Sequence, residues 1–323
     1  MIHYFREALE GNGAVFAGNS MLTYSMLQAD HHVITPEIND PNYIDFLLDY
    51  SIRNQIQAIV PLFDVDLPVL SRNKSRFTAS GISVLVSDEE IVNICRDKWL
   101  TARFCRENNI RYPQTYISYA ELLSDISSGK IDFPLIVKPR WGMGSTAICQ
   151  ADDMQELEVY NKKVKKEIFE TYLKFESAGK EDQCVLFQEK ISGVEYGLDI
   201  LNDLNGRFIT TVSKRKIAMR AGETDVAEIV CNELFSGSDR KIADALKHIG
   251  NLDVDCILME NGAICVLEMN GRFGGQYPFS HLAGVDFPRQ IIKWLCGGET
   301  DRSLLTPVIG TIGCKDLLPV KMT

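Results

Sequence analysis

The sequence predicts a mixed fold, with an α/β arrangement in its first part and an α+β arrangement with antiparallel hairpins in the remainder. Short apolar segments alternate with helical ones through the first hundred residues, which is typical of a parallel sheet covered by helices. After Pro113 the pattern changes to strand-like runs, hairpins and two longer helices. The chain has 323 residues, 45% of them hydrophobic, and at roughly 150 residues per domain this length indicates two or three domains.

Composition and charge argue against several classes of protein. The 44 acidic residues outnumber the 34 lysines and arginines, giving a net charge of −10, whereas a nucleic-acid-binding surface is expected to be basic. No apolar stretch approaches the roughly 20 residues that a membrane helix requires, and the N-terminal MIHYFREALEG is too charged for a secretory signal. We therefore expect a soluble cytoplasmic protein that binds neither nucleic acid nor membranes.

The remaining sequence patterns are those of an ordinary globular protein. Nine cysteines are scattered without a C-x-x-C pair or a Cys/His cluster, which favours buried, reduced thiols. The basic run KKVKK at 162–166 precedes Glu167 and Glu170 in an amphipathic pattern and is interpreted as a solvated helix face. No histidine lies in a recognisable triad, and no dinucleotide fingerprint occurs, so nucleophilic hydrolysis and hydride transfer are poorly supported.

The first ninety residues predict a small doubly wound domain. Strands are expected at 14–17, 32–35, 58–61 and 83–86. Asp40 and Pro41 form a helix start before YIDFLLDYSIRNQ, and Ser87 with Glu90 forms a capping-box pattern before a helix through IVNICRDKWLTARFC. The chain begins with a helix-like segment, YFREALEG, which no strand and glycine-rich turn precede.

The stretch from 253 to 275 holds the most informative pattern. Asn261-Gly262 predicts a two-residue hairpin turn, which needs positive φ at both positions. In that register Asp255 lies directly opposite Glu268, and Asp253 lies opposite Asn270, on one face of the ribbon. Two carboxylates would then stand about 5 Å apart.

The Asp255 and Glu268 carboxylates require a compensating cation, because like charges directly opposite one another destabilise a sheet. Mg²⁺ prefers carboxylate and amide oxygens, which Asp255, Glu268 and Asn270 could supply. The alternative is a solvent-facing polar strand edge, with the carboxylates separated by twist or paired with Arg272. From spacing alone the two interpretations carry equal weight.

A second stretch, FPLIVKPRWGMGSTAI at 133–148, places Lys138 at the end of a strand before a glycine-rich turn. Backbone amides in such a turn can approach phosphate oxygens closely, and the lysine would add a point charge. The pattern is not a GxxxxGK[ST] phosphate loop, because no lysine follows the glycines. Taken alone, this stretch favours a flexible hairpin tip.

A third stretch, residues 187–225, predicts two strands joined by an Asn-Gly turn at 205–206. That register places Glu195 near Lys216 and Gly197 near Lys214, although a longer loop would shift it. One interpretation is a surface ribbon with ion pairs that each contribute well under about 1 kcal/mol. The glycine at 197 slightly favours the other, a ligand lying on this face.

Five motifs occur in the order typical of one protein family: RDKWLT, LIVKP with its glycine-rich loop, FQEKISGVEYGLDI, KRKIAMRAGETD and VLEMNGRFGGQYP. In these motifs the chain resembles the ATP-grasp superfamily, and most closely its carbamoyl-phosphate-synthase-large-subunit-like branch of small carboxylate–amine ligases. The resemblance runs from about residue 14 to 296. The last motif is the most specific and is similar to a family pattern of Glu-x-Asn-Pro-Arg, although Gly271 stands where the family has proline.

The resemblance implies an ATP-grasp fold of three parts. These are a preATP-grasp, Rossmann-like domain at 1–90 that lacks its first strand, a central lid subdomain at 91–185, and a C-terminal subdomain at 186–323 with the Mg²⁺-binding hairpin. ATP would be held between the last two parts.

The resemblance also implies roles for individual residues, by their positions in the motifs. Lys98 and Lys138 would contact ATP phosphates, and Gly142, Gly144, Ser145 and Thr146 would close over them. Glu189, Lys190, Ile191 and Ser192 would form a hinge at the adenine, and Glu195 would hold the ribose. Asp255, Glu268 and Asn270 would bind Mg²⁺, or Mn²⁺ in its place, and Arg272 would face the transferring phosphoryl group. Lys214, Lys216 and Arg220 would lie on the substrate side.

The activity implied is that of an ATP-dependent ligase acting on small molecules. A carboxylate would attack the γ-phosphoryl group to give an acyl phosphate, and an amine would then displace phosphate. Two alternatives stay open, a kinase that phosphorylates a hydroxyl group and a non-catalytic ATP-binding module. A homodimer is one possible assembly.

Overall fold

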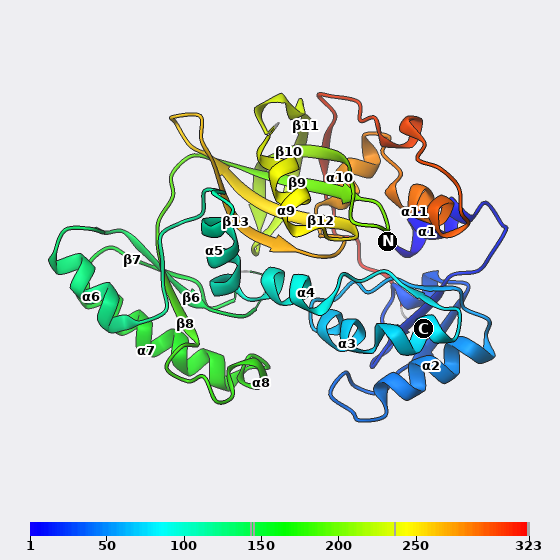
Figure 1. Cartoon of the computed structure of the whole chain (residues 1–323), viewed down its shortest axis with the longest axis horizontal. Coiled ribbons are helices and arrows are strands. Elements are labelled where there is room, and N and C mark those ends of the chain that lie inside the picture. The colour runs from blue at the N-terminus through cyan, green and yellow to red at the C-terminus, as the bar shows by residue number, and fades with distance from the viewer. Residues whose placement is uncertain (143, 145, 236, 322–323) are drawn as a thin grey trace.

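The computed structural model describes residues 1–142, 144, 146–235 and 237–321. A six-stranded sheet lies above two smaller groups of elements, the N-terminal part at lower right and a lid-like part at lower left (Figure 1). The C-terminal end of the chain returns toward the N-terminal part. Within the described ranges, no helix has the length and apolar character needed to cross a membrane.

The N-terminal part contains the four predicted strands close to their expected places. Its elements are α1 (Ile2–Leu9), β1 (Phe16–Asn19), the 3₁₀ helix η1 (Met26–Gln28), β2 (His31–Ile34), α2 (Tyr43–Arg53), β3 (Ala58–Ile59), α3 (Asp66–Ala79), β4 (Ser83–Val84) and α4 (Glu89–Arg96). Strand β1 pairs with β2, and β3 with β4, both in parallel. The parallel pairing is confirmed, but the strands form two separate ladders in place of one sheet.

The helix predicted through residues 91–105 is broken at Asp97 into α4 and α5 (Lys98–Glu107). The Asp97 carboxylate accepts hydrogen bonds from the amides of Trp99 and Leu100 and so caps the start of α5. The predicted Ser87 capping box is also wrong. The Ser87 hydroxyl instead accepts a 3.0 Å hydrogen bond from the Ile249 amide, which ties this segment to the C-terminal part.

The lid-like part is an antiparallel four-stranded sheet in the order β5-β8-β6-β7. Its elements are β5 (Thr115–Tyr116), α6 (Tyr119–Ser127), β6 (Leu135–Pro139), β7 (Cys149–Ala151), α7 (Met154–Glu170), α8 (Lys174–Ser177) and β8 (Val185–Glu189). Leu157, Val164 and Ile168 on α7 belong to one buried core with Leu135 and Val137 on β6. This core fixes the strand that carries Lys138.

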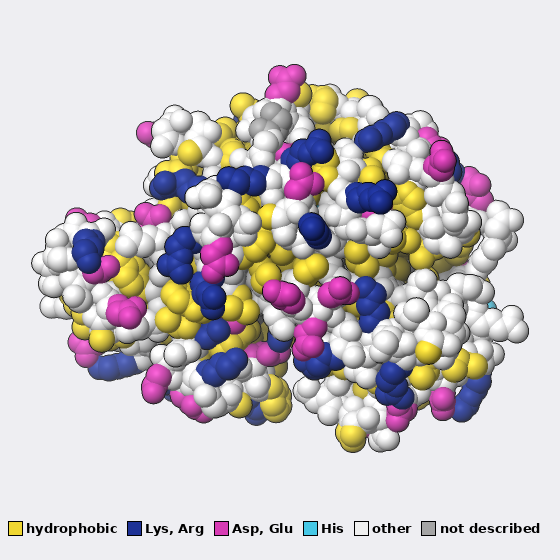
Figure 2. Space-filling view, in the orientation of Figure 1, with side chains coloured by type: hydrophobic (Ala, Val, Ile, Leu, Met, Phe, Trp, Pro, Cys, Tyr) yellow, Lys and Arg dark blue, Asp and Glu magenta, His cyan; other side chains and the backbone are white. Residues whose placement is uncertain are grey.

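The KKVKK run lies on α7 and forms a solvated helix face, as predicted. Lys162 pairs with Glu158 and Lys166 with Glu170, each four residues apart along the helix. Basic and acidic side chains are also mixed elsewhere on the surface. On the face of the molecule shown in Figure 2, Lys and Arg side chains are interspersed with Asp and Glu and form no single basic patch.

The C-terminal part is built on one antiparallel sheet in the order β13-β12-β9-β10-β11-β14. Its elements are β9 (Val194–Asn202), β10 (Phe208–Arg220), β11 (Glu223–Val230), the 3₁₀ helix η2 (Asn232–Leu234), α9 (Ser238–Leu246), β12 (Gly250–Leu258), β13 (Ile264–Asn270), α10 (Tyr277–Leu282), α11 (Phe287–Leu295), the 3₁₀ helix η3 (Arg302–Leu305) and β14 (Ile312–Cys314). One buried core joins the sheet to α4, α5 and α9, and a second joins it to α10 and α11.

The β12–β13 hairpin differs from the predicted two-residue turn, yet its predicted cross-strand pairs are correct. The Met259 amide donates to the Ala263 carbonyl, so three residues form the loop, and the last of them, Gly262, has φ +80°. A β-bulge beyond Asp255 then shifts the ladder by one residue, and Asp255 lies opposite Glu268.

The β9–β10 hairpin repeats this arrangement. The Asp203 amide donates to the Arg207 carbonyl, and Gly206 has φ +76°, so the loop again has three residues. An irregularity after the first strand pair shifts the register back, and Gly197 lies opposite Lys214 as predicted. In both hairpins the error in the turn is therefore cancelled by a bulge.

The thiols are free, as predicted, but they are not all buried. All nine cysteines are unpaired with one another. Five are buried, whereas Cys231, Cys296 and Cys314 are exposed, contrary to the expectation of burial.

Replacing Gly206 by alanine is expected to destabilise the protein by about 2–3 kcal/mol, more than the same change at Gly262. Both glycines have positive φ, which costs an alanine about 1 kcal/mol. A Cβ at Gly206 would also lie 2.7 Å from the Lys247 carbonyl oxygen, whereas one at Gly262 meets no heavy atom within 4 Å. Urea unfolding of both variants measures the difference, and equal losses would contradict this explanation.

His248 is expected to make the fold sensitive to acid. It is fully buried, with Nε2 3.1 Å from the Ile200 carbonyl oxygen, and burial lowers its pKa to about 4 from 6.5. Between these values the unfolded chain binds a proton that the folded chain does not, so this contribution to stability falls as the pH is lowered from 6.5 to 4.

The His248→Gln variant cannot take up this proton. Between pH 7 and pH 4.5 it should lose up to about 2–3 kcal/mol less unfolding free energy than the wild type. Urea titrations at the two pH values provide the comparison. If both proteins lose the same unfolding free energy between the two pH values, His248 is not the group that makes the fold sensitive to acid.

Candidate active site

The predicted carboxylate pair comes together at the β12–β13 hairpin. Asp255 on β12 lies opposite Glu268 on β13, and Asp253 lies opposite Asn270, which confirms the predicted register. Leu267 is the extra residue of the bulge and lies directly beside this pair. Two anionic side chains therefore occupy one face of the ribbon.

Each of these two carboxylates is paired with a lysine from another segment. Lys98 Nζ lies 3.2 Å from Glu268 Oε1, and Lys216 Nζ lies 2.7 Å from Asp255 Oδ1. Burial alone would raise the pKa of Glu268, but the charges of Lys98 and Lys138 outweigh burial and lower it. Burial likewise opposes the charge on Lys216, but Asp255 outweighs it, so the pKa of Lys216 is raised. The lysines supply the compensating positive charge that such a pair requires.

Lys138 on β6 is a second buried lysine close to Lys98. Burial, followed by the charge of Lys98, lowers the pKa of Lys138 to about 8. Lys98 Nζ also donates a 2.6 Å hydrogen bond to the Gly142 carbonyl oxygen, so the same lysine holds the beginning of the glycine-rich turn. In that turn Gly144 and Thr146 are exposed, and Ser145 lies outside the described residues.

Three consecutive residues at the break between α4 and α5 hold different parts of the chain. Arg96 pairs with Glu176 of α8, and Lys98 reaches Glu268. Between them, Asp97 accepts hydrogen bonds of 2.8 and 2.7 Å from Nε and Nη2 of Arg140, and the two side chains are only 6% and 8% exposed. The unpredicted helix break at Asp97 therefore lies where three residues in a row contact other segments of the chain.

Gln276 lies across the carboxylate face of the sheet. Its Nε2 donates hydrogen bonds to Asp253 and, at 3.1 Å, to Asp255. A Cβ at Gly197 would lie 1.5 Å from Gln276 Oε1, and one at Gly274 would lie 2.0 Å from Asp253 Oδ2. Both glycines are thus required for this packing, and the space beside Gly197 is filled by Gln276. Burial, with the nearby charges of Asp255 and Asp199, raises the pKa of Asp253 to about 7.

Arg272 forms an ion pair with a carboxylate in the N-terminal part of the chain. Its Nε donates a 2.9 Å hydrogen bond to Asp64 Oδ1, and its Nη2 pairs with the other oxygen of the same carboxylate. Asp64 precedes α3 and lies 208 residues away in the sequence. Arg272 Nη1 also lies 3.9 Å from Asp253 Oδ2 on the hairpin, whereas the ion-pair partners of Asp255 and Glu268 are lysines.

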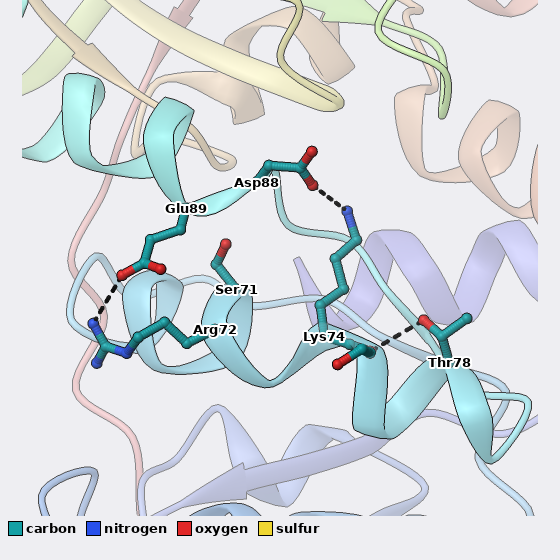
Figure 3. Close-up of a pocket in the computed structure, with 7 residues that line it drawn as sticks. Ser71, Arg72, Lys74, Thr78, Asp88 and Glu89 are labelled. Atoms are coloured by element: carbon teal, nitrogen blue, oxygen red, sulfur yellow. Dashed lines mark hydrogen bonds and ion pairs between the residues drawn. The ribbon is translucent and has the colours of Figure 1, made fainter.

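A narrow cavity of about 30 Å³ lies where these segments meet. Its lining comes from all three parts of the chain and includes Asp64, Arg96, Gly142, Leu173, Glu268 and Asn270. A larger open depression of about 500 Å³ lies on α3, and none of the predicted site residues lines it (Figure 3). There Arg72 pairs with Glu89 and Lys74 with Asp88. The small cavity, not the larger depression, coincides with the predicted site.

Two family models match the chain. A model of the PylC-like N-terminal domain matches residues 1–85, and a model of the ATP-grasp domain matches residues 131–278, which include Lys138, Glu268 and Arg272. Residues 131–278 therefore match an ATP-grasp domain. That the N-terminal domain lacks the first strand of its relatives stays a prediction.

The chain also has relatives of low sequence identity among carbamoyl-phosphate synthases. It is 25% identical over 229 residues to the carbamoyl phosphate synthase large chain of Thermoanaerobacter sp. (strain X514), a match that covers 68% of this chain and 20% of that protein. It is 24% identical over 277 residues to a carbamoyl-phosphate synthase of Methanobrevibacter smithii, covering 80% and 68% of the two chains. The chain therefore spans about a fifth of the first relative's length.

Solved structures share its fold. Biotin carboxylase from Campylobacter jejuni, in a complex with β-γ-ATP, superposes with a TM-score of 0.75 at 15% identity, over 96% of this chain and 72% of that one. The L-amino acid ligase from Bacillus licheniformis gives 0.74 at 18% identity, over 99% and 79%. The ATP-grasp fold predicted from the sequence is thereby confirmed.

The adenine hinge predicted at residues 189–192 connects β8 to β9 of the ATP-grasp domain. The Glu189 carboxylate accepts a 2.9 Å hydrogen bond from the Gln114 amide, and the Lys190 amide donates to the Pro134 carbonyl oxygen at 3.3 Å. Ile191 and Ser192 follow in an irregular segment. Their contact with a nucleotide stays a prediction.

Lys214 is fully buried. It lies opposite Gly197, and its Nζ contacts the Asp199 carboxylate and, at 3.2 Å, the Ser280 hydroxyl. All three polar side chains are fully buried. In this structure Lys214 is a buried ion-pair partner in the sheet, and its role toward a substrate stays a prediction.

The other predicted substrate-side residues lie along the same hairpin. Lys216 is 4.0 Å from Glu195 Oε2, which confirms their expected proximity. Arg220 pairs with Asp225 at the turn between β10 and β11 and is exposed to solvent. The roles of Glu195, Lys216 and Arg220 stay predictions.

The donor set of the hairpin fits Mg²⁺ in its chemistry. Asp255 and Glu268 contribute carboxylates, and Asn270 beside them contributes an amide oxygen, which are the oxygen ligands that this ion prefers. Among the described residues there is no cluster of three His, Cys, Asp or Glu side chains arranged for a metal.

Several residues of the site were missed by the sequence analysis. These are Asp64, Asp97, Arg140 and Gln276. Asp97 and Gln276 stand inside the quoted motifs, and the capping preference of aspartate offered one signal for the helix break at 97. Asp64 had no local signal, because its partner lies on a distant segment.

Removing the buried charge of Asp97 is expected to be costly. The Asp97→Asn variant leaves Arg140 without its counterion in a nearly dry environment and should lose about 3 kcal/mol of unfolding free energy. Asp88→Asn, which breaks the exposed pair with Lys74, is the matched control and should change stability by less than about 0.5 kcal/mol. Urea unfolding gives both values. Similar small losses in the two variants would show that the Asp97 pair does not hold the junction.

Proposed function

We propose that this chain is an ATP- and Mg²⁺-dependent ligase that activates a small-molecule carboxylate as an acyl phosphate for attack by an amine. The observation that carries the proposal is the convergence of Lys98 with Asp255, Glu268 and Arg272, the last three of which lie within the ATP-grasp domain match at 131–278. Phosphoryl transfer requires charge neutralisation and positioning more than a protein nucleophile, and these residues supply both. Similarity to structures described as a biotin carboxylase and an L-amino acid ligase supports the same class of reaction.

Asp255, Glu268 and Asn270 would hold the metal ion. Mg²⁺ bound there would neutralise negative charge on the phosphate oxygens. Gln276 donates to Asp255 and restricts the orientation of that carboxylate, so it would act as a positioning residue.

Lys98 and Lys138 would bind phosphate oxygens beside the glycine-rich turn. Because the pKa of Lys138 is about 8, most of this lysine remains protonated at neutral pH and carries the charge that phosphate requires. Asp64 holds the guanidinium of Arg272 through two of its nitrogens, so the N-terminal domain would orient the arginine that faces the transferring group.

The proposed reaction proceeds in two displacements. A carboxylate oxygen attacks the γ-phosphorus, the bond to the bridging oxygen breaks, and ADP leaves with an acyl phosphate as product. The amine nitrogen then attacks the acyl carbon, phosphate departs, and the amine loses a proton to form the amide. The exposed Arg220 turn would contact the substrates, which we propose to be small molecules.

The proposal is tested by incubating the protein with ATP, Mg²⁺ and a panel of carboxylates and amines, and by measuring ADP and inorganic phosphate separately. A ligase releases both in equal amounts. ADP with phosphate retained on an acceptor would indicate a kinase, and ATP binding with background ADP formation across the panel would indicate a non-catalytic module.

Glu268→Gln is expected to lower Mg²⁺-dependent turnover at least about tenfold, because the change removes a metal-ligating charge and keeps the side-chain shape. Glu260→Gln, in the exposed loop of the same hairpin, is the matched control and should retain wild-type turnover. The measurement is ADP formation as a function of Mg²⁺ concentration. Unchanged turnover in Glu268→Gln would remove this residue from the metal site.

A further inference from the structure

Lys98 and Lys216 form ion pairs with the two carboxylates that are proposed to bind Mg²⁺. Lys216 Nζ contacts Asp255 Oδ1 at 2.7 Å, and Lys98 Nζ contacts Glu268 Oε1 at 3.2 Å. The two lysine side chains are only 6% and 9% exposed. They come from β10 and the start of α5, so each contact joins the hairpin to a different segment.

Each lysine also has a second oxygen within reach. Lys98 Nζ lies 2.6 Å from the Gly142 carbonyl oxygen, and Lys216 Nζ lies 4.0 Å from Glu195 Oε2. Loss of the first carboxylate contact would therefore not leave either ammonium group without an acceptor. The Lys214–Asp199 pair differs from these two in burial, because both of its side chains are fully buried.

An ammonium group and a divalent cation compete for one carboxylate, because both are attracted to the same charge and repel each other at a separation of a few ångströms. We propose that Lys98 and Lys216 are internal counterions of the metal site. They hold Asp255 and Glu268 in place, are displaced when a divalent cation binds, and are then free to contact phosphate oxygens. The inference rests on the metal site of the proposed function and adds an exchange of partners to it.

The first test measures metal affinity in a lysine variant. If Lys216 competes with the metal, Lys216→Met should bind Mn²⁺ more tightly than the wild type, by at least about fivefold, although it loses a residue of the site. Electron paramagnetic resonance of free Mn²⁺, without nucleotide, gives the affinity.

Lys315→Met is the matched control. Lys315 Nζ lies 3.0 Å from Glu223 on the neighbouring hairpin, so the variant makes the same change in charge away from the proposed ligands. Its Mn²⁺ affinity should stay within about twofold of the wild type. Unchanged or weaker binding in Lys216→Met, or equal tightening in both variants, would overturn the inference.

The second test uses the wild type and does not depend on the variant folding. Acylation of lysines by an amine-reactive reagent, followed by mass spectrometry, reports how free each ammonium group is. Adding Mn²⁺ should increase labelling of Lys216 relative to Lys315, because the ion releases Lys216 from Asp255. Unchanged or decreased relative labelling would contradict the exchange.

These measurements separate the inference from the proposed ligase activity. Tighter Mn²⁺ binding by Lys216→Met together with no ADP formation across the substrate panel would support the exchange and overturn the ligase. Wild-type turnover that depends on Mg²⁺, with no tightening in Lys216→Met, would support the ligase and overturn the exchange. No Mn²⁺ binding by the wild type would overturn both the exchange and the proposed metal site.

Discussion

The buried ion pair between Asp97 and Arg140 is the interaction on which the geometry of the site depends. Asp97 also caps α5, so one carboxylate fixes the direction of the helix and the position of the lid-like strand β6. Lys98 follows directly in the chain and therefore reaches Glu268 from a fixed point. A buried arginine that lost this partner would carry an uncompensated charge, which makes alternative positions of the junction costly.

The sequence predicted the carboxylate pairing correctly because the polar and apolar faces of the hairpin leave one workable register. A three-residue loop without a bulge would turn every side chain on one strand to the opposite face. The face occupied by Val254 and Cys256 is packed against α5 and α9 in a buried core. Glu268 on that face would be buried without a partner. The bulge at Leu267 restores the register that the core requires, although no local sequence pattern predicted the bulge.

Contacts between distant segments could not be predicted from local patterns. The Asp64–Arg272 pair joins residues 208 apart, and the Asp97–Arg140 pair joins residues 43 apart. Gly197 gave a correct indication of close approach, since a side chain there would clash, but the group that approaches is Gln276 of the same chain. Periodicity and turn chemistry identify which face a residue lies on, and they do not identify what packs against that face.

The size of the cavity determines which contacts must change when a nucleotide binds. A volume of about 30 Å³ accommodates roughly one water molecule, so a triphosphate placed here would require the surrounding side chains or the lid-like part to shift. Among the described residues, contacts that hold the lid-like part there include Asp97–Arg140, Arg96–Glu176, the hydrogen bond from the Lys98 amide to the Arg140 carbonyl oxygen, and the hydrogen bond from Lys98 Nζ to Gly142. The first is buried and makes several hydrogen bonds, whereas the last is a single bond to a glycine. Release of the Gly142 carbonyl therefore costs less than movement of β6, and Lys98, which contacts both Gly142 and Glu268, couples Gly142 to the carboxylates.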